Sequence, residues 1–173
     1  MKFVCIMGRS GSSKSTVESY LEKLGYKRSI SFTTRKPRDG EQNGKDYFFV
    51  NEKKFMELVN KGIIIEYENN YGNLYGTQAP VGSTKYVGVL GLGGVRALKD
   101  KYGSQVISIY LECDKVIALD RIYNRDKNDK ESLSRADEDD KITAEMKKEA
   151  DYIIDSNRNI NEIIADILLS IKQ

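Results

Sequence analysis

The sequence predicts an α/β fold with a mostly parallel sheet. Short apolar runs of strand length alternate with segments whose apolar residues recur at helical spacing, and this alternation continues through most of the 173 residues. Such alternation is typical of βαβ units, in which helices cover a parallel sheet. Within 32–77 strand-like runs follow one another instead, so this interval is interpreted as an insertion built on a small mixed sheet. No repeat or linker divides the chain, and a single domain is expected over 1–173.

The elements can be placed in order from their apolar spacing and their end signals. An apolar strand at 3–7 precedes a helix at 16–24, which ends before Gly25 because glycine readily adopts the backbone that closes a helix. Asn51 is a suitable N-cap for a helix at 52–60. The other expected elements are strands at 26–32, 45–50, 63–68, 86–90, 106–111 and 152–154, a turn-rich ribbon at 69–77, a loop at 78–85, helices at 95–101, 114–125 and 160–171, and a weak helix at 132–148 that follows a highly charged flap at 126–131.

The strand at 3–7 runs directly into a loop rich in glycine and serine, Gly8-Arg9-Ser10-Gly11-Ser12-Ser13-Lys14-Ser15-Thr16. The backbone N–H groups of such a loop, the following helix N-terminus and a lysine together suit a phosphate group. The spacing fits the P-loop pattern except at Ser13, where the pattern has glycine. That position tends to need a backbone conformation that residues with a side chain adopt only with strain. An ordinary strand-to-helix turn is the alternative interpretation.

Basic residues gather in two further places. Arg35, Lys36 and Arg38 lie within four residues of a loop that contains proline and glycine. Arginine pairs of this kind can hold a phosphate through bidentate hydrogen bonds, although a solvated basic loop is the simpler alternative. Arg121 and Arg125 share one face of their predicted helix, and Arg135 follows in the charged segment. For these three, surface ion pairing is the alternative.

Composition excludes several classes of chemistry. With no histidine and two cysteines, the chain cannot form a His/Cys zinc site or a Ser-His or Cys-His nucleophile. Cys5 and Cys113 lie in apolar runs and are expected to be buried free thiols. A net charge of +2 and a pI near 8.4 are too mild to indicate nucleic-acid binding. No apolar run is long enough for a membrane span and no secretion signal is present, so a cytoplasmic location is expected, while the oligomeric state is left open.

Further motifs follow the loop in a fixed order. A Thr-Thr-Arg-x-Pro-Arg string within 31–41 precedes Asp-Tyr-x-Phe within 44–50, then Glu66 and Gly-Asn-x-Tyr-Gly-Thr at 72–77, and a last strand carries Tyr152 with Asn157 just beyond it. In this combination the motifs resemble the guanylate kinase family, and the resemblance covers nearly the whole chain. It implies a P-loop NTPase-like three-layer core (1–31, 78–121 and 141–173), an inserted GMP-binding segment (32–77) and a mobile helical lid (122–140).

The resemblance also implies an activity and its residues. The activity is transfer of the γ-phosphoryl group of ATP to GMP or dGMP with Mg²⁺, and the partners are these small nucleotides, not nucleic acid or membrane. The implied ATP-binding residues are Gly8, Arg9, Ser10, Gly11, Ser12, Ser13, Lys14, Ser15, Thr16 and Asn157, with Ser15 also ligating the metal. The implied GMP-binding residues are Ser31, Arg35, Arg38, Tyr47 and Tyr75 for the phosphate, and Glu66 and Thr77 for the base. The implied catalytic residues are Lys14, Arg121, Arg125 and Arg135.

The chain departs from the family pattern in three places. Ser13 replaces the loop glycine, and the segment between 77 and 86 is short and lacks the helix expected there. The family usually has an Asp-x-Asp-x-x-Gly run before its central helix, whereas the matching run here is Val89-Leu90-Gly91-Leu92-Gly93-Gly94, with no carboxylate. Two alternative functions therefore stand beside the kinase: a guanylate-kinase-like binding module without turnover, and a P-loop kinase with another acceptor. Retention of Lys14, Ser15 and the lid arginines argues against the module.

Overall fold

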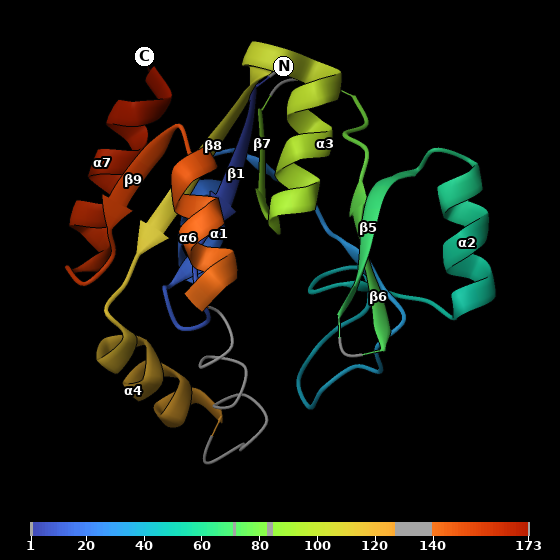
Figure 1. The fold of residues 1–173 in the computed structure, drawn as a ribbon, viewed down its shortest axis with the longest axis horizontal. Coiled ribbons are helices and arrows are strands. Elements are labelled where there is room, and N and C mark those ends of the chain that lie inside the picture. The colour runs from blue at the N-terminus through green and yellow to red at the C-terminus, as the bar shows by residue number, and fades with distance from the viewer. Residues whose placement is uncertain (1, 71, 83–84, 127–139, 173) are drawn as a thin grey trace.

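Five parallel strands form the central sheet of the computed structural model, which describes residues 2–70, 72–82, 85–126 and 140–172 (Figure 1). The strand order is β2-β7-β1-β8-β9. Every neighbouring pair is parallel. This confirms the predicted α/β class with a mostly parallel sheet. The strands are β1 (Lys2–Met7), β2 (Lys27–Arg28), β7 (Lys85–Val89), β8 (Val106–Glu112) and β9 (Tyr152–Asp155).

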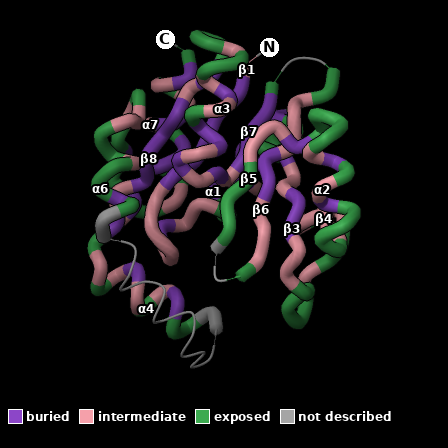
Figure 2. The backbone as a smooth tube through the Cα atoms, turned by 45° about the vertical axis from the view of Figure 1, so that its right-hand side comes forward, coloured by how far each residue is buried: buried purple, intermediate pink, exposed green. Residues whose placement is uncertain are grey.

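Helices cover both faces of this sheet. Successive residues of β1 point to opposite sides, so β1 presents an apolar face to the helices on each side. Val4 and Ile6 pack with α1 (Lys14–Lys23) and α7 (Ile160–Lys172), whereas Phe3, Cys5 and Met7 pack with α3 (Leu92–Tyr102), which a 3₁₀ turn, η1 (Gly103–Gln105), follows. Met146 of α6 (Asp140–Glu149) packs on the same side of the sheet as α3. The result is a three-layer core, and Figure 2 shows the buried residues concentrated along the central strands.

A second sheet stands beside the core and carries the predicted insertion. Its order is β4-β3-β6-β5, made of β3 (Phe32–Thr33), β4 (Phe48–Phe49), β5 (Ile64–Asn70) and β6 (Asn73–Gln78). The β3–β4 pair is parallel and the other two pairs are antiparallel, so the sheet is mixed as predicted. Phe55 and Leu58 of α2 (Glu52–Asn60) pack against it. Asn51 caps α2 as expected, since its side chain accepts the Lys54 N–H at 2.8 Å.

Several element boundaries differ from the sequence predictions. The predicted strand at 26–32 is two short strands, β2 and β3, because the chain leaves the central sheet there and enters the second one. The strand predicted at 45–50 is reduced to β4, and half of the predicted ribbon at 69–77 is the regular strand β6, paired to β5. The helix predicted at 95–101 begins at Leu92, since the glycines before Val95 continue the helix instead of preceding it.

Helix α4 (Lys115–Asp126) follows the carboxyl end of β8 and extends away from the central sheet (Figure 1). Residues 127–139, which include most of the predicted flap and Arg135, lie outside the described residues, so the lid and its bounds stay a prediction.

The described part of 78–85 contains no helix, in agreement with the expected loop. Cys5 and Cys113 are buried and free, as predicted. Within the described ranges no helix has the length and apolar character that crossing a membrane requires.

Candidate active site

A cavity of about 1390 Å³ lies where the loop after β1 faces the second sheet. Its wall combines the β1–α1 loop, residues of the 32–77 insertion, the first turn of α3 and parts of α4 and α6. The structure thus brings together segments that lie far apart in the sequence. The sequence-predicted residues that line the cavity are Gly8, Ser10, Gly11, Ser13, Lys14, Ser15, Thr16, Ser31, Arg35, Arg38, Tyr47, Glu66, Tyr75, Thr77 and Arg121.

The two glycines of the loop are required by close packing and by backbone shape. Gly8 has φ +145°, and a Cβ there would lie 2.6 Å from Ser12 Oγ and 2.8 Å from the carbonyl oxygen of Leu111. Gly11 has φ +80°, and a Cβ there would clash with the carbonyl oxygen of Ala118 in α4. The loop is therefore held tightly between β8 and α4.

Ser13 keeps the loop geometry without being glycine. Its φ of 65° and ψ of 20° are left-handed, and among the described residues it is the one non-glycine with positive φ. It forms the N-cap of α1 without a side-chain hydrogen bond. The sequence prediction of a strained position is confirmed, and the strain is local because the helix follows normally.

The Lys14 side chain folds back over the loop. Its Nζ donates to the carbonyl oxygens of Gly8 at 2.7 Å and Arg9 at 2.6 Å. The ammonium charge is thereby held above the loop, at the beginning of α1. A positive charge at a helix N-terminus is the arrangement that suits an anion.

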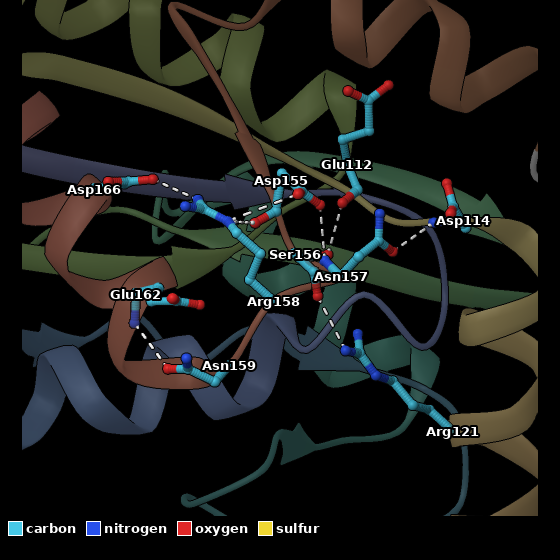
Figure 3. Close-up of polar contacts among 10 residues, drawn as sticks. All are labelled: Glu112, Asp114, Arg121, Asp155, Ser156, Asn157, Arg158, Asn159, Glu162 and Asp166. Atoms are coloured by element: carbon cyan, nitrogen blue, oxygen red, sulfur yellow. Dashed lines mark hydrogen bonds and ion pairs between the residues drawn. The ribbon is translucent and has the colours of Figure 1, made fainter.

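Arg121 is fixed beside the same loop. Its guanidinium donates to the carbonyl oxygen of Gly11 at 3.3 Å. It also donates to the carbonyl oxygen of Ser156 at 3.0 Å, as Figure 3 shows. Arg125 stands one turn further along α4, and Arg135 lies outside the described residues. Of the predicted catalytic arginines, the structure places Arg121 at the cavity wall, and the Arg125 side chain and Arg135 are not among the described parts of the chain.

Three predicted ATP-binding residues do not line the cavity: Arg9, Ser12 and Asn157. Ser12, within the loop, is fully buried. Asn157 Oδ1 accepts the N–H of Asp114 at 3.0 Å, which ties the chain after β9 to the start of α4 (Figure 3). The roles of these residues in ATP binding stay predictions.

The basic loop of the insertion is organised by a residue that the sequence interpretation gave no role. Glu41 accepts both arms of the Arg35 guanidinium, at 2.9 and 2.8 Å, and the backbone N–H of Arg38 at 2.7 Å. The Arg35 guanidinium also lies 5.5 Å from the ring centre of Tyr47. Burial alone would lower the pKa of Arg35, but its hydrogen bonds to Glu41 raise the pKa above its ordinary value. Arg35 is thus charged, and Glu41 holds its guanidinium in place at the cavity wall.

Glu66 and Thr77 face each other across the β5–β6 pair. Thr77 Oγ1 donates to Glu66 Oε2 at 3.3 Å. Burial raises the pKa of Glu66, and the negative charge of Glu68 raises it further. The Glu66 carboxylate is half-buried and lines the cavity, so it faces the pocket and not the outer surface.

The glycine-rich run 91–94 forms the surface on which these side chains lie. A Cβ at Gly93 would stand 2.8 Å from Glu66 Oε1, and a Cβ at Gly94 would stand 2.5 Å from Thr77 Oγ1. In the sequence this run is notable for its lack of acidic residues, and its packing role was not predicted. No local signal could reveal that role, because the partners come from β5 and β6.

A buried ion pair is a further feature that the sequence did not predict. Glu18 of α1 pairs with Arg28 of β2, and Glu18 Oε1 accepts the N–H of Val89 at 3.2 Å. All three residues line the cavity. Burial raises the pKa of Glu18 even though Arg28 and the Val89 N–H act in the opposite direction. The available signal was a glutamate four residues after Lys14 on an otherwise apolar helix face.

The donor set of the site suits Mg²⁺ held mainly by a nucleotide. Within the described ranges no group of three or more His, Cys, Asp or Glu side chains could hold a metal ion. Ser15 offers a hydroxyl in the first turn of α1, at the cavity wall. Mg²⁺ commonly takes one or two protein ligands and completes its coordination with waters and substrate phosphates. The residues present are compatible with that mode.

The chain is similar to guanylate kinases both in sequence and in fold. The model of the guanylate kinase family matches residues 1–173. A guanylate kinase from Prochlorococcus marinus is 35% identical over 146 residues, covering 78% of this chain and 77% of its own length. A guanylate kinase from Lactobacillus acidophilus is 47% identical over 83 residues, 46% of this chain.

The solved guanylate kinase from Anaplasma phagocytophilum covers 99% of this chain and 84% of its own, with a TM-score of 0.70 and 24% identity, a likeness of fold. The matches cover less than two thirds of several curated relatives, and 40% of the one from L. acidophilus. Because the family model matches all 173 residues and the fold agrees, the chain belongs to the guanylate kinase family.

Proposed function

We propose that the protein transfers the γ-phosphoryl group of ATP to GMP or dGMP, giving ADP and GDP or dGDP. The observation that carries this proposal is the shared cavity, whose wall includes the phosphate loop with Lys14 on one side and Arg35, Arg38 and Glu66 on the other. Membership of the guanylate kinase family supports the same activity.

On the donor side, the loop N–H groups and Lys14 would hold the β- and γ-phosphates of ATP. Ser15 would ligate Mg²⁺, which when bound neutralises charge on these phosphates. Arg121 would stabilise the charge that develops on the transferred group, and we assign the same role to Arg125 and Arg135 from the family resemblance. We assign Arg9, Ser12 and Asn157 to the ATP side on the resemblance alone.

On the acceptor side, the phosphate of GMP would be held by a basic and hydroxyl-rich wall. Arg35 is already oriented by Glu41 and by the ring of Tyr47, which reduces the entropy lost when it binds an anion. The other residues that we assign to this phosphate are Ser31, Arg38, Tyr47 and Tyr75.

Glu66 and Thr77 would recognise the base. An ionised carboxylate accepts hydrogen bonds and cannot donate them. Guanine presents N1–H and an exocyclic amine at one edge, and adenine has neither donor there, so Glu66 favours guanine.

In the chemical step an oxygen of the GMP phosphate forms a bond to the γ-phosphorus while the bond from that phosphorus to the ADP oxygen breaks. The protein contributes position and charge stabilisation.

We further infer that the protein uses ATP with Mg²⁺ and free nucleotides instead of nucleic acid, and that it works in the cytoplasm, where these nucleotides are available. The net charge of +2 gives no electrostatic preference for nucleic acid.

A coupled assay of ADP release with GMP, dGMP, AMP, CMP and UMP, with and without Mg²⁺, tests this function. We expect turnover with GMP and dGMP that depends on Mg²⁺, and loss of turnover in Lys14→Met. Absence of turnover with every acceptor, together with measurable GMP binding, would favour the binding module. Preference for AMP or UMP over GMP would indicate a kinase with another acceptor and would contradict the role given to Glu66.

A further inference from the structure

Glu68 lies two residues after Glu66 on β5. Because strand side chains alternate between faces, both side chains point to the same side of the second sheet. Both line the cavity, and the charge of Glu68 contributes to the raised pKa of Glu66. The two carboxylates therefore share one region of the site.

Gly91 leaves the space in which the Glu68 carboxylate lies. A Cβ at position 91 would stand 2.9 Å from Glu68 Oε1 and 3.5 Å from both Oε2 and Cδ. Gly91 is the N-cap of α3, with φ −74° and ψ 174°, a backbone that any residue adopts. The space left at position 91 is thus occupied by the Glu68 carboxylate, and the backbone there does not require glycine.

The same relation repeats two residues further along the chain. Gly93 leaves room for Glu66 Oε1 in the same way. The first turn of α3, whose N–H groups carry partial positive charge, faces both carboxylates and offsets part of their mutual repulsion. A glycine surface with two carboxylates from β5 therefore forms one wall of the acceptor side.

We propose that Glu68 is a second acceptor-recognition residue, which binds the exocyclic amine of guanine beside Glu66. This inference rests on the proposed function. Guanine presents three N–H hydrogens at the edge in question, one on N1 and two on the amine. The Glu66 carboxylate accepts two of them through its two oxygens, and Glu68 accepts the remaining amine hydrogen.

Glu68 thereby supplies from β5 a carboxylate beside the run 89–94, which has no acidic residue of its own. A base without the exocyclic amine makes no contact with Glu68. The discrimination that Glu68 adds is therefore between GMP and IMP, whose hypoxanthine base keeps N1–H and lacks the amine.

The test compares GMP and IMP with the wild-type protein and three variants. Glu68→Gln keeps the size of the side chain and replaces one acceptor oxygen with a donor. Gly91→Ala keeps Glu68 and places a methyl group where its carboxylate lies. Glu57→Gln, on the exposed side of α2 and outside the cavity, is the matched control. Binding is measured by calorimetry, turnover by ADP release and folding by circular dichroism.

In Glu68→Gln we expect GMP to bind about tenfold more weakly and IMP to change less than twofold, since the charge-assisted hydrogen bond to the amine is replaced by a neutral one. Gly91→Ala should shift the GMP-to-IMP ratio in the same direction, and Glu57→Gln should leave it unchanged. An unchanged GMP-to-IMP ratio in both cavity variants, in a protein that phosphorylates GMP, would overturn the role of Glu68 alone. Failure of the wild-type protein to bind or phosphorylate GMP would overturn the proposed function and this inference together.

Discussion

Arg28 Nε lies 2.6 Å from Glu18 Oε2, and the two side chains are 19% and 4% exposed. This ion pair joins α1, which begins at the phosphate loop, to β2 at the edge of the central sheet. Since Glu18 also accepts the N–H of Val89, it links three elements at the base of the cavity.

Removal of one partner of this pair should destabilise the fold more than removal of both. Glu18→Ala leaves the Arg28 guanidinium without its counter-charge, and we expect a loss of about 3 kcal/mol, at the low end for buried pairs because Arg28 keeps some exposure. The double variant Glu18→Leu/Arg28→Met should lose less than Glu18→Ala. Urea unfolding measures both, and equal losses in the two variants would show that the charges are not coupled.

Ser13→Gly should stabilise the protein. The left-handed conformation costs a residue with a Cβ about 1–2 kcal/mol, and the greater freedom of glycine in the unfolded chain offsets about 0.5–1 kcal/mol of the gain. A net gain of roughly 0.5–1 kcal/mol is expected in thermal or urea unfolding.

The matched control is Gly25→Ala. Gly25 has φ +87° with no atom within 4 Å of its Cβ position, so alanine there introduces strain alone and should destabilise by about 1 kcal/mol. A destabilised Ser13→Gly variant would mean that the Ser13 hydroxyl has a structural role.

Arg38→Ala should raise the KM for GMP about ten- to hundredfold, which corresponds to a lost charge-assisted contact of roughly 1.5–3 kcal/mol. Arg38 lines the cavity, and Glu41 holds its backbone N–H. Steady-state kinetics measure the change. Lys36→Ala, in the same loop and exposed, is the control and should leave the KM nearly unchanged. An equal KM in both variants would return Arg38 to the role of a solvated loop residue.

GMP binding should tighten as the pH rises through the pKa of Glu66. Burial first, and then the negative charge of Glu68, raise this pKa above its ordinary value, and the hydrogen bond from Thr77 only partly opposes them. Below the raised pKa the carboxyl group is protonated, so one acceptor oxygen is lost; above it the ionised group accepts both guanine hydrogens. Calorimetric titration with GMP across this range measures the transition.

Glu66→Gln is the control for this pH dependence. The GMP phosphate also loses a proton near pH 6, as phosphate monoesters do, and this contribution remains in the variant. The difference between the wild-type and variant profiles reports Glu66. Identical profiles would contradict its role in base recognition.

Local chemistry was sufficient for much of the fold and part of the site. An apolar strand, a Gly/Ser loop and a lysine before an amphipathic helix predicted the phosphate loop, and the pattern at Ser13 predicted its left-handed backbone. The alternation of strand-length apolar runs with segments of helical spacing predicted the parallel sheet, and the order of motifs indicated the family. These features depend on residues that are neighbours in the chain, so periodicity and spacing can report them.

Contacts between distant residues could only be seen in the tertiary structure. The chain at 26–32 divides between two sheets because its hydrogen-bond partners differ: β7 belongs to the central sheet and β6 to the second sheet. The bidentate contact of Glu41 with Arg35, the Glu18–Arg28 pair and the glycine surface under Glu66 and Glu68 join side chains whose proximity no local pattern encodes. The sequence showed an acid-free run at 89–94; the structure showed that Gly91 and Gly93 leave room for carboxylates from β5, which a Cβ at either position would have to displace.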